Sequence, residues 1–194
     1  MIFIDGGYLR ETLKEIAANE TWSIGALIEN LRGHFHLYDA LVIGGGLHIP
    51  SHIRTYYYDA NYDKDDPRFE EARDDYEGNR RYFDSLSDNE SVEVKLGQLV
   101  ASDSGNRQKG VDTLIAIDML TKAYMNHYDI AILFSGDSDL LPLVKAVKDV
   151  SGKRVFGVYF AGHCKDEMKR AFDKELEITD ENLSIITGEK EESS

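Results

Sequence analysis

Cysteine is nearly absent from this chain: Cys164 is the only one among 194 residues. A single thiol excludes a disulfide framework and a cysteine-based zinc site within one chain, and it fits a reducing compartment. The chain also has no run of about 18 apolar residues, and no basic segment leads into an apolar one at its start. We therefore expect a cytoplasmic protein with no membrane partner and no removable leader.

Positive charge is scarce as well, because 22 lysines and arginines stand against 36 aspartates and glutamates, for a net charge of −14. This balance argues against a protein that coats nucleic acid through a broad basic surface. It does not exclude a nuclease, since a bound divalent cation reverses the local electrostatics and can itself receive a phosphate.

The composition that remains is that of an ordinary soluble domain, with 42% hydrophobic and 30% charged residues. A chain of this length can bury a proper core as one domain. We expect residues 1–188 to form that domain and residues 189–194 to form a disordered acidic tail.

Short apolar runs alternate with segments of helical spacing along the chain. We expect strands at 1–5, 53–59, 92–100, 129–135, 154–160 and 185–186. We expect helices at 8–18, 23–31, 67–86, 111–126, 139–149 and 165–176. Residues 102–109 are predicted as a polar loop, and residues 39–50 give no clear assignment. The alternation predicts a single α/β, Rossmann-like domain with a mainly parallel sheet flanked by helices on both faces.

Aspartates recur where the predicted strands end. Asp5 follows the first strand, Asp137 and Asp139 follow the strand at 129–135, and Asp112 opens the helix entered from the third strand. Because parallel strands end at one edge of a sheet, we expect these four side chains to gather there as catalytic groups and metal ligands. Facing carboxylates repel one another, and a hard cation such as Mg²⁺ or Mn²⁺ relieves that repulsion. The predicted chemistry is metal-assisted hydrolysis of a phosphodiester.

Each of the four aspartates also has a structural interpretation. Asp5 stands before two glycines and could form a turn or cap a helix, and the other three could cap the helices that follow them. Asp59 ends the strand at 53–59, but a polar loop follows it and explains it without function. Asp118 lies about 240° around its helix from Asp112, so it is predicted to support the site from behind or to be structural. The four together are the signal, because no single member is specific.

Two bases stand close to the predicted site in the sequence. Arg107 and Lys109 come just before the helix at 111–126, where they could hold a phosphate backbone. Other bases are more simply explained as solvated surface charges: Arg10, Arg54, Arg80 and Arg81.

Three segments together resemble one protein family. They are F-I-D-G-G-Y-L at residues 3–9, K-G-V-D-T-L-I-A-I-D at 109–118 and S-G-D-S-D-L-L-P-L-V at 135–144. In order and spacing they resemble the NYN domain family of PIN-like proteins, especially its LabA-like branch, and I-R-T-Y-Y-Y-D-A at 53–60 is also similar to that branch. The resemblance spans nearly the whole chain, and the third segment is its most specific part.

The resemblance implies a PIN-like fold and a metal-dependent ribonuclease that cleaves RNA. It assigns the metal and the catalysis to the four aspartates and matches Asp118 to a recurring family aspartate. We also expect Ser135, together with Arg107 and Lys109, to bind the substrate. Tyr8 departs from the family, which commonly carries asparagine soon after the first aspartate. This departure implies altered substrate positioning, or a specialised or weakened activity.

Two other functions are open alternatives. One is a binding module for RNA or protein that keeps the metal site but cleaves weakly or not at all. The other is a haloacid-dehalogenase-like phosphatase, which needs a second acid two residues after the first, where this chain has Gly7. No G-x-G-x-x-G follows any predicted strand, which argues against a dinucleotide-binding module. A homodimer is an alternative to a monomer, since small nucleases often need a second copy to shape their groove.

Overall fold

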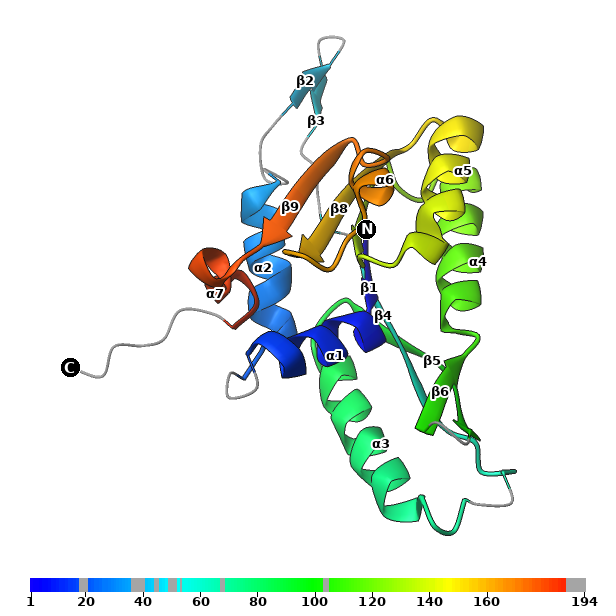
Figure 1. Cartoon of the computed structure of the whole chain (residues 1–194). Helices are drawn as coiled ribbons and strands as arrows, with labels where there is room; N and C mark the ends of the chain where they lie inside the picture. Colours follow the sequence, from blue (N-terminus) through cyan, green and yellow to red (C-terminus); the bar gives the residue numbers. More distant parts are fainter. Residues whose placement is uncertain are drawn as a thin grey trace, which may run out of the picture.

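The protein is an α/β domain built around a seven-stranded sheet, as seen in a computed structural model (Figure 1). The structure describes residues 1–17, 21–35, 41–43, 46–48, 52, 54–66, 69–102 and 105–187. The strand order is β6-β5-β4-β1-β7-β8-β9, and only the β5–β6 pair is antiparallel. The predicted mainly parallel α/β sheet is thereby confirmed.

The strands of this sheet are β1 (Ile2–Asp5), β4 (Thr55–Tyr62), β5 (Val92–Ser102), β6 (Gly105–Lys109), β7 (Ile130–Phe134), β8 (Arg154–Phe160) and β9 (Lys174–Ile178). A separate two-stranded sheet pairs β2 (Leu41–Ile43) with β3 (Gly46–His48). The longer helices are α1 (Gly6–Ile16), α2 (Ile24–His34), α3 (Arg73–Ser87), α4 (Val111–Tyr124) and α5 (Leu141–Ser151). The short ones are η1 (Ser138–Leu140), α6 (Asp166–Lys169), η2 (Asp180–Asn182) and α7 (Ser184–Thr187).

The first strand lies at the centre of the sheet, between β4 and β7. All four of its residues are buried, which is why it reads in the sequence as an unbroken apolar run ending in an acid. Successive side chains of a strand point to opposite faces. Ile2 and Ile4 accordingly belong to a core cluster that includes residues of α1, α2 and α3, whereas Phe3 belongs to a second cluster with residues of α4 and α5.

Several predicted elements are wrong. Residues 165–176 were expected to form one helix, but α6 ends at Lys169 and the edge strand β9 follows it. The polar segment at 102–109 contains β6, which has no apolar side chain and is a strand because it pairs with β5. Residues 185–186 lie in α7 rather than in a strand. The expected helix at 67–86 begins only at Arg73.

Two further predictions concern the C-terminal tail and the absence of a membrane span. The predicted acidic tail at 189–194 lies outside the described residues. In the part that is described, no helix is both long enough and apolar enough to cross a membrane.

Gly157 in β8, the strand next to the edge strand β9, tests how tightly the sheet is packed. A Cβ at this position would overlap the ring of Phe172, whereas a Cβ at Gly78 inside α3 would meet nothing within 4 Å. We expect Gly157→Ala to lower the free energy of unfolding by about 1–3 kcal/mol through overpacking. Gly78→Ala should raise it by about 0.5–1 kcal/mol, because alanine loses less backbone entropy in a helix. Urea unfolding of both variants checks this, and equal stabilities would contradict it.

Candidate active site

A groove with a volume of about 720 Å³ lies where the parallel strands end. Its lining comes from α1, from the β5–β6 hairpin, from the start of α4 and from the loop after β7. Three of the four predicted aspartates line it: Asp5, Asp112 and Asp137. Asp5 and Asp137 lie close together because β1 and β7 are parallel neighbours and therefore end at the same edge of the sheet.

Asp5 is the most buried of these acids, with 5% of its surface exposed. It ends β1 and caps α1, and its Oδ1 accepts a hydrogen bond from the Tyr8 amide at 3.0 Å. Its Oδ2 accepts a second one from the Ser135 hydroxyl, also at 3.0 Å. The pKa of Asp5 is raised to about 6. Burial is the largest cause, the two hydrogen bonds lower the pKa in part, and the charges of Asp112 and Asp137 add to the increase.

The loop after β7 places Asp137 through a chain of hydrogen bonds. Ser135 is fully buried, and besides donating to Asp5 its hydroxyl oxygen accepts the Asp137 amide at 3.2 Å. Asp137 in turn caps η1 by accepting the Asp139 amide at 2.9 Å. The structure thus places Ser135 behind the groove, where it connects two acids. Asp139 is exposed and does not line the groove.

Asp112 reaches the groove from the first turn of α4. The turn into this helix needs Gly110, whose φ of 86° lies in the left-handed region that other residues rarely adopt. Burial, followed by the charges of Asp137 and Asp139, raises the pKa of Asp112 above its usual range. Asp139 therefore acts on the site through its charge, although it lies outside the groove lining.

The donor set at the groove fits a hard divalent cation. Carboxylate oxygens from three elements converge there, and their repulsion is what a positive charge would relieve. Within the described ranges, no three His, Cys, Asp or Glu side chains are close enough to hold a metal ion. Such a ligand set is not required for magnesium, which typically takes one or two carboxylates and completes its coordination with water and substrate phosphate.

The two bases predicted from the sequence lie on β6, whose antiparallel pairing with β5 brings them to this edge. Arg107 is exposed and lines the groove. Lys109 is exposed as well but is not among the lining residues. Between them, Gln108 also lines the groove, and its amide packs so closely on the start of α1 that a Cβ at Gly7 would lie 2.6 Å from it.

Arg10 lines the groove, although the sequence favoured a solvated surface charge at this position. Its Nε and Nη2 donate to the two carboxylate oxygens of Asp59 at 2.8 and 2.7 Å. Asp59 is fully buried within β4, which continues to Tyr62 instead of ending at Asp59 as predicted, and it also accepts hydrogen bonds from Tyr57, from the Ala60 amide and from Gln108. The Arg10 side chain remains 22% exposed and lines the groove, so its guanidinium is oriented there by a buried acid.

The sequence contained both halves of this pair, each with a plausible local explanation. Asp59 lies within a buried strand and Arg10 lies on the helix after β1, 49 positions away. Only the parallel pairing of β1 with β4 brings them together. The signal that could have found them is an acid within a buried strand, because such a charge needs a partner.

Asp118 lies in a separate ion-pair cluster and does not line the groove. It accepts hydrogen bonds from Tyr58 at 2.8 Å and Lys122 at 2.8 Å, and it forms an ion pair with Lys95 at 2.6 Å. Burial alone would raise the pKa of Asp118, but these hydrogen bonds outweigh it and the pKa is lowered. Its geometry is that of a structural residue joining α4 to β4 and β5.

Tyr8 lines the groove, but its hydroxyl is engaged elsewhere. The hydroxyl donates to the His163 carbonyl at 3.1 Å and accepts the Phe160 amide at 3.0 Å. Its ring packs beside Phe134 and Phe160. Tyr8 thereby ties α1 to the end of β8, and its contribution to the acids is the backbone amide that it gives to Asp5.

The raised pKa of Asp5 predicts a pH-dependent gain from Asp5→Asn. A buried acid with a pKa raised from 3.8 to about 6 destabilises the folded state once it ionises, so its effect is absent below pH 3.8 and complete above about pH 6. We expect the variant to unfold with a free energy on the order of 2–3 kcal/mol higher than the native protein at pH 8, in EDTA. The difference should shrink towards pH 4. Urea unfolding at both pH values checks this, and a variant that is less stable at pH 8 would contradict it.

The comparisons with known proteins agree with the fold. A crystal structure of a protein of unknown function from Vibrio parahaemolyticus is similar with a TM-score of 0.62 and 18% sequence identity, over 92% of this chain and 91% of that one. At that identity the likeness shows the fold alone. No curated protein matches the chain. The family model of the NYN domain matches residues 1–179, which confirms the resemblance of the three sequence segments. This chain therefore belongs to the NYN domain family.

Proposed function

We propose that this protein is a metal-dependent ribonuclease that hydrolyses phosphodiester bonds of RNA in the groove at the end of the sheet. The family is typically one of nucleases, which supports a hydrolase at a coarse level. The observation that carries the proposal is that Asp5, Asp112 and Asp137 line one groove, where burial and, to a lesser extent, the charges of Asp112 and Asp137 raise the pKa of Asp5. RNA as the substrate, and Mg²⁺ or Mn²⁺ as the cofactor, follow from the family resemblance and from the preference of these ions for oxygen ligands.

In this proposal one or two carboxylates among Asp5, Asp112 and Asp137 would hold the cation directly, with water completing its coordination, and Asp139 adds negative charge from outside the groove. A cation bound there supplies a water of lowered pKa and offsets the charge that develops on the phosphate. Ser135 keeps Asp5 and Asp137 in position through its two hydrogen bonds. The site is therefore preorganised by buried groups rather than by the exposed acids themselves.

The bases of the groove would hold the nucleic-acid backbone. Arg10, Lys14 and Arg107 all line it, and they come from α1 and β6 rather than from the strand ends that carry the acids. An arginine whose guanidinium is already oriented loses little freedom when it binds a phosphate. Arg10, fixed by Asp59, is the base that best meets this condition.

The binding-module alternative is favoured by one observation, the engagement of Tyr8. Its hydroxyl bonds the backbone at residues 160 and 163, so it offers the groove no amide of the kind that the expected asparagine would provide. The phosphatase alternative remains disfavoured by Gly7 itself, which stands where that family needs a second acid. A side chain at this position would require the amide of Gln108 to shift.

The first test is cleavage of labelled single-stranded and structured RNA with Mg²⁺ or Mn²⁺. We expect Asp137→Asn to lower the rate on the order of 100-fold or more, because it removes a negative charge that would bind the cation, and the cation offsets the charge that develops on the phosphate. The matched control is Asp129→Asn, since Asp129 precedes the same strand at its opposite end and its side chain is 95% exposed. EDTA should abolish the activity of both the native protein and the control. Cleavage that survives EDTA would sink the proposal, and metal-dependent RNA binding without cleavage would favour the binding module.

A second test addresses Arg10 through binding rather than cleavage. In an Asp137→Asn background, Arg10→Ala should weaken RNA binding and reduce the slope of log K against log salt by about 0.7, the value for one phosphate contact on a single strand. Arg10→Lys should restore binding only in part, because lysine cannot keep the two-pronged contact with Asp59. Arg54→Ala is the control, since Arg54 pairs with Glu93 and lies before the opposite end of β4. Equal salt slopes for Arg10→Ala and its parent would remove Arg10 from the binding surface.

A further inference from the structure

Helix α4 carries apolar side chains on two faces. One face is buried in the core and includes Ile115 and Met119. The other is exposed and presents Ile117, Leu120 and Tyr124, which lie three and four residues apart and so form one stripe. A helix that is apolar on both sides is typical of one that is covered on both sides. Nothing within the described part of the chain covers the second face.

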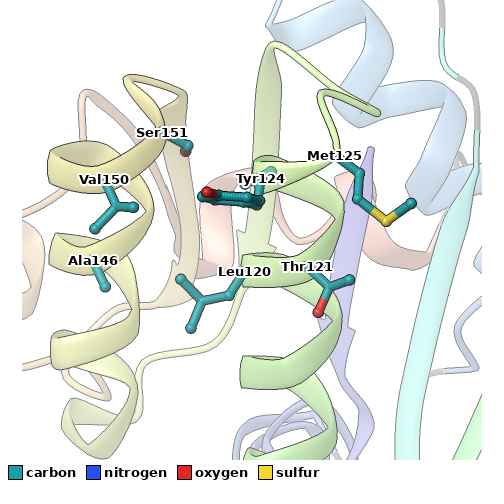
Figure 2. A pocket seen from close by; sticks show the side chains of 8 residues that line it. Leu120, Thr121, Tyr124, Met125, Ala146, Val150 and Ser151 are labelled. Carbon is teal, nitrogen blue, oxygen red and sulfur yellow. The ribbon is translucent and has the colours of Figure 1, made fainter.

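This stripe borders a groove between α4 and α5, which lie side by side. In Figure 2, Leu120 and Tyr124 point from α4 towards α5, where Ala146 and Val150 face them. Tyr124 is 80% exposed and Val150 is 67% exposed. Among the described residues eight large apolar side chains are exposed, and five of them gather at this α4–α5 face: Ile117, Leu120, Tyr124, Met125 and Val150.

The exposed area is of the size that a dimer needs. The five exposed fractions together equal about three whole side chains. At roughly 150–250 Å² for a large side chain, they offer on the order of 500 Å² of apolar surface. A standard interface covers about 800 Å² on each partner, and somewhat more than half of that area is apolar. The largest apolar patch of a typical monomer is about 300–600 Å², and such a patch often marks an interaction site.

The charges favour a second copy of the chain as the occupant. None of the eight residues that line the groove is charged, whereas the chain as a whole carries −14. Two copies of so acidic a chain repel one another, so they meet most favourably at a face where charges are few or are paired with opposite charges. Lys145 and Asp149, exposed and one turn apart on α5, come one position before the groove residues Ala146 and Val150. In a two-fold arrangement each Lys145 can face the Asp149 of the other copy.

The two edge strands of the sheet are less suited to dimerisation than the α4–α5 face. At one edge β6 has the sequence G-N-R-Q-K, and at the other β9 has K-E-L-E-I with both glutamates exposed. Charged side chains on edge strands discourage the addition of a strand from another molecule.

We propose that the protein forms a homodimer through the α4–α5 face, across a two-fold axis that places the Tyr124 side chains near the centre and pairs Lys145 with Asp149 of the second copy. The face lies away from the groove that holds the acids. Asp112 begins α4 and Tyr124 ends it, about 18 Å apart along the helix axis. The dimer and the ribonuclease are therefore independent proposals, and each can fail alone.

Sedimentation velocity over a range of concentrations is the first test. We expect native protein at twice the 22.0 kDa chain mass. Tyr124→Glu and Val150→Glu should each weaken dimerisation by at least about 30-fold, as expected for residues near the centre of an interface. Ile16→Glu is the matched control, because Ile16 is another exposed apolar residue but lies on α1. A monomer at every concentration, or a dimer that survives both substitutions, would overturn the proposal; the monomer would leave the face to a partner of different sequence.

A charge swap tests the two-fold pairing itself. Lys145→Asp alone and Asp149→Lys alone should each lower the dimer fraction, because like charges would then face one another. The double variant should regain the native dimer fraction. A mixture of the two single variants should form heterodimers, since both contacts are then between opposite charges. Single variants that dimerise as the native protein does, or a mixture that stays monomeric, would refute the pairing.

Discussion

Two hydrogen bonds hold the carboxylate of Asp5 in a nearly dry position, and the candidate active site is arranged around them. The bond from the Tyr8 amide starts α1 directly at the end of β1. The bond from Ser135 fixes the loop after β7, and through it Asp137. The two bonds lower the pKa of Asp5 but do not cancel the effect of burial, so the pKa stays raised. This edge of the sheet therefore favours the binding of a positive charge, which the folded chain does not itself supply.

The sequence predicted those features that depend on one strand and the turn after it. The buried run of β1, the acid at its end and the similar ending of β7 were readable, because strands of a parallel sheet all end at the same edge. The features it did not reveal depend on partners far along the chain. β6 is a strand only because β5 pairs with it, and Arg10 is ordered only because Asp59 lies beside it. β9 was missed because Met168, Ala171 and Phe172 keep helical spacing until two positions before the strand begins.

The distribution of charge gives the groove a character that the net charge hides. A chain with a charge of −14 repels nucleic acid over most of its surface. Three bases nevertheless line the groove, beside the acids that would take a cation. Four acids line the groove as well, and Lys14 pairs with Glu11. Under the proposed function, attraction between the groove and a phosphate backbone therefore depends on the bound cation.

The two hydrogen bonds of the Tyr8 hydroxyl restrict which residues can replace tyrosine at this position. The hydroxyl satisfies the Phe160 amide and the His163 carbonyl, and Gly136 leaves the space in which it sits, since a Cβ there would come within 2.6 Å of it. An asparagine at position 8 is too short to reach both groups, so a return to the residue expected from the family would leave two backbone groups unpaired. Tyrosine here and the loop at 161–163 must therefore change together. The tyrosine at position 8 is therefore structurally coupled to the end of β8, whose backbone groups its hydroxyl satisfies.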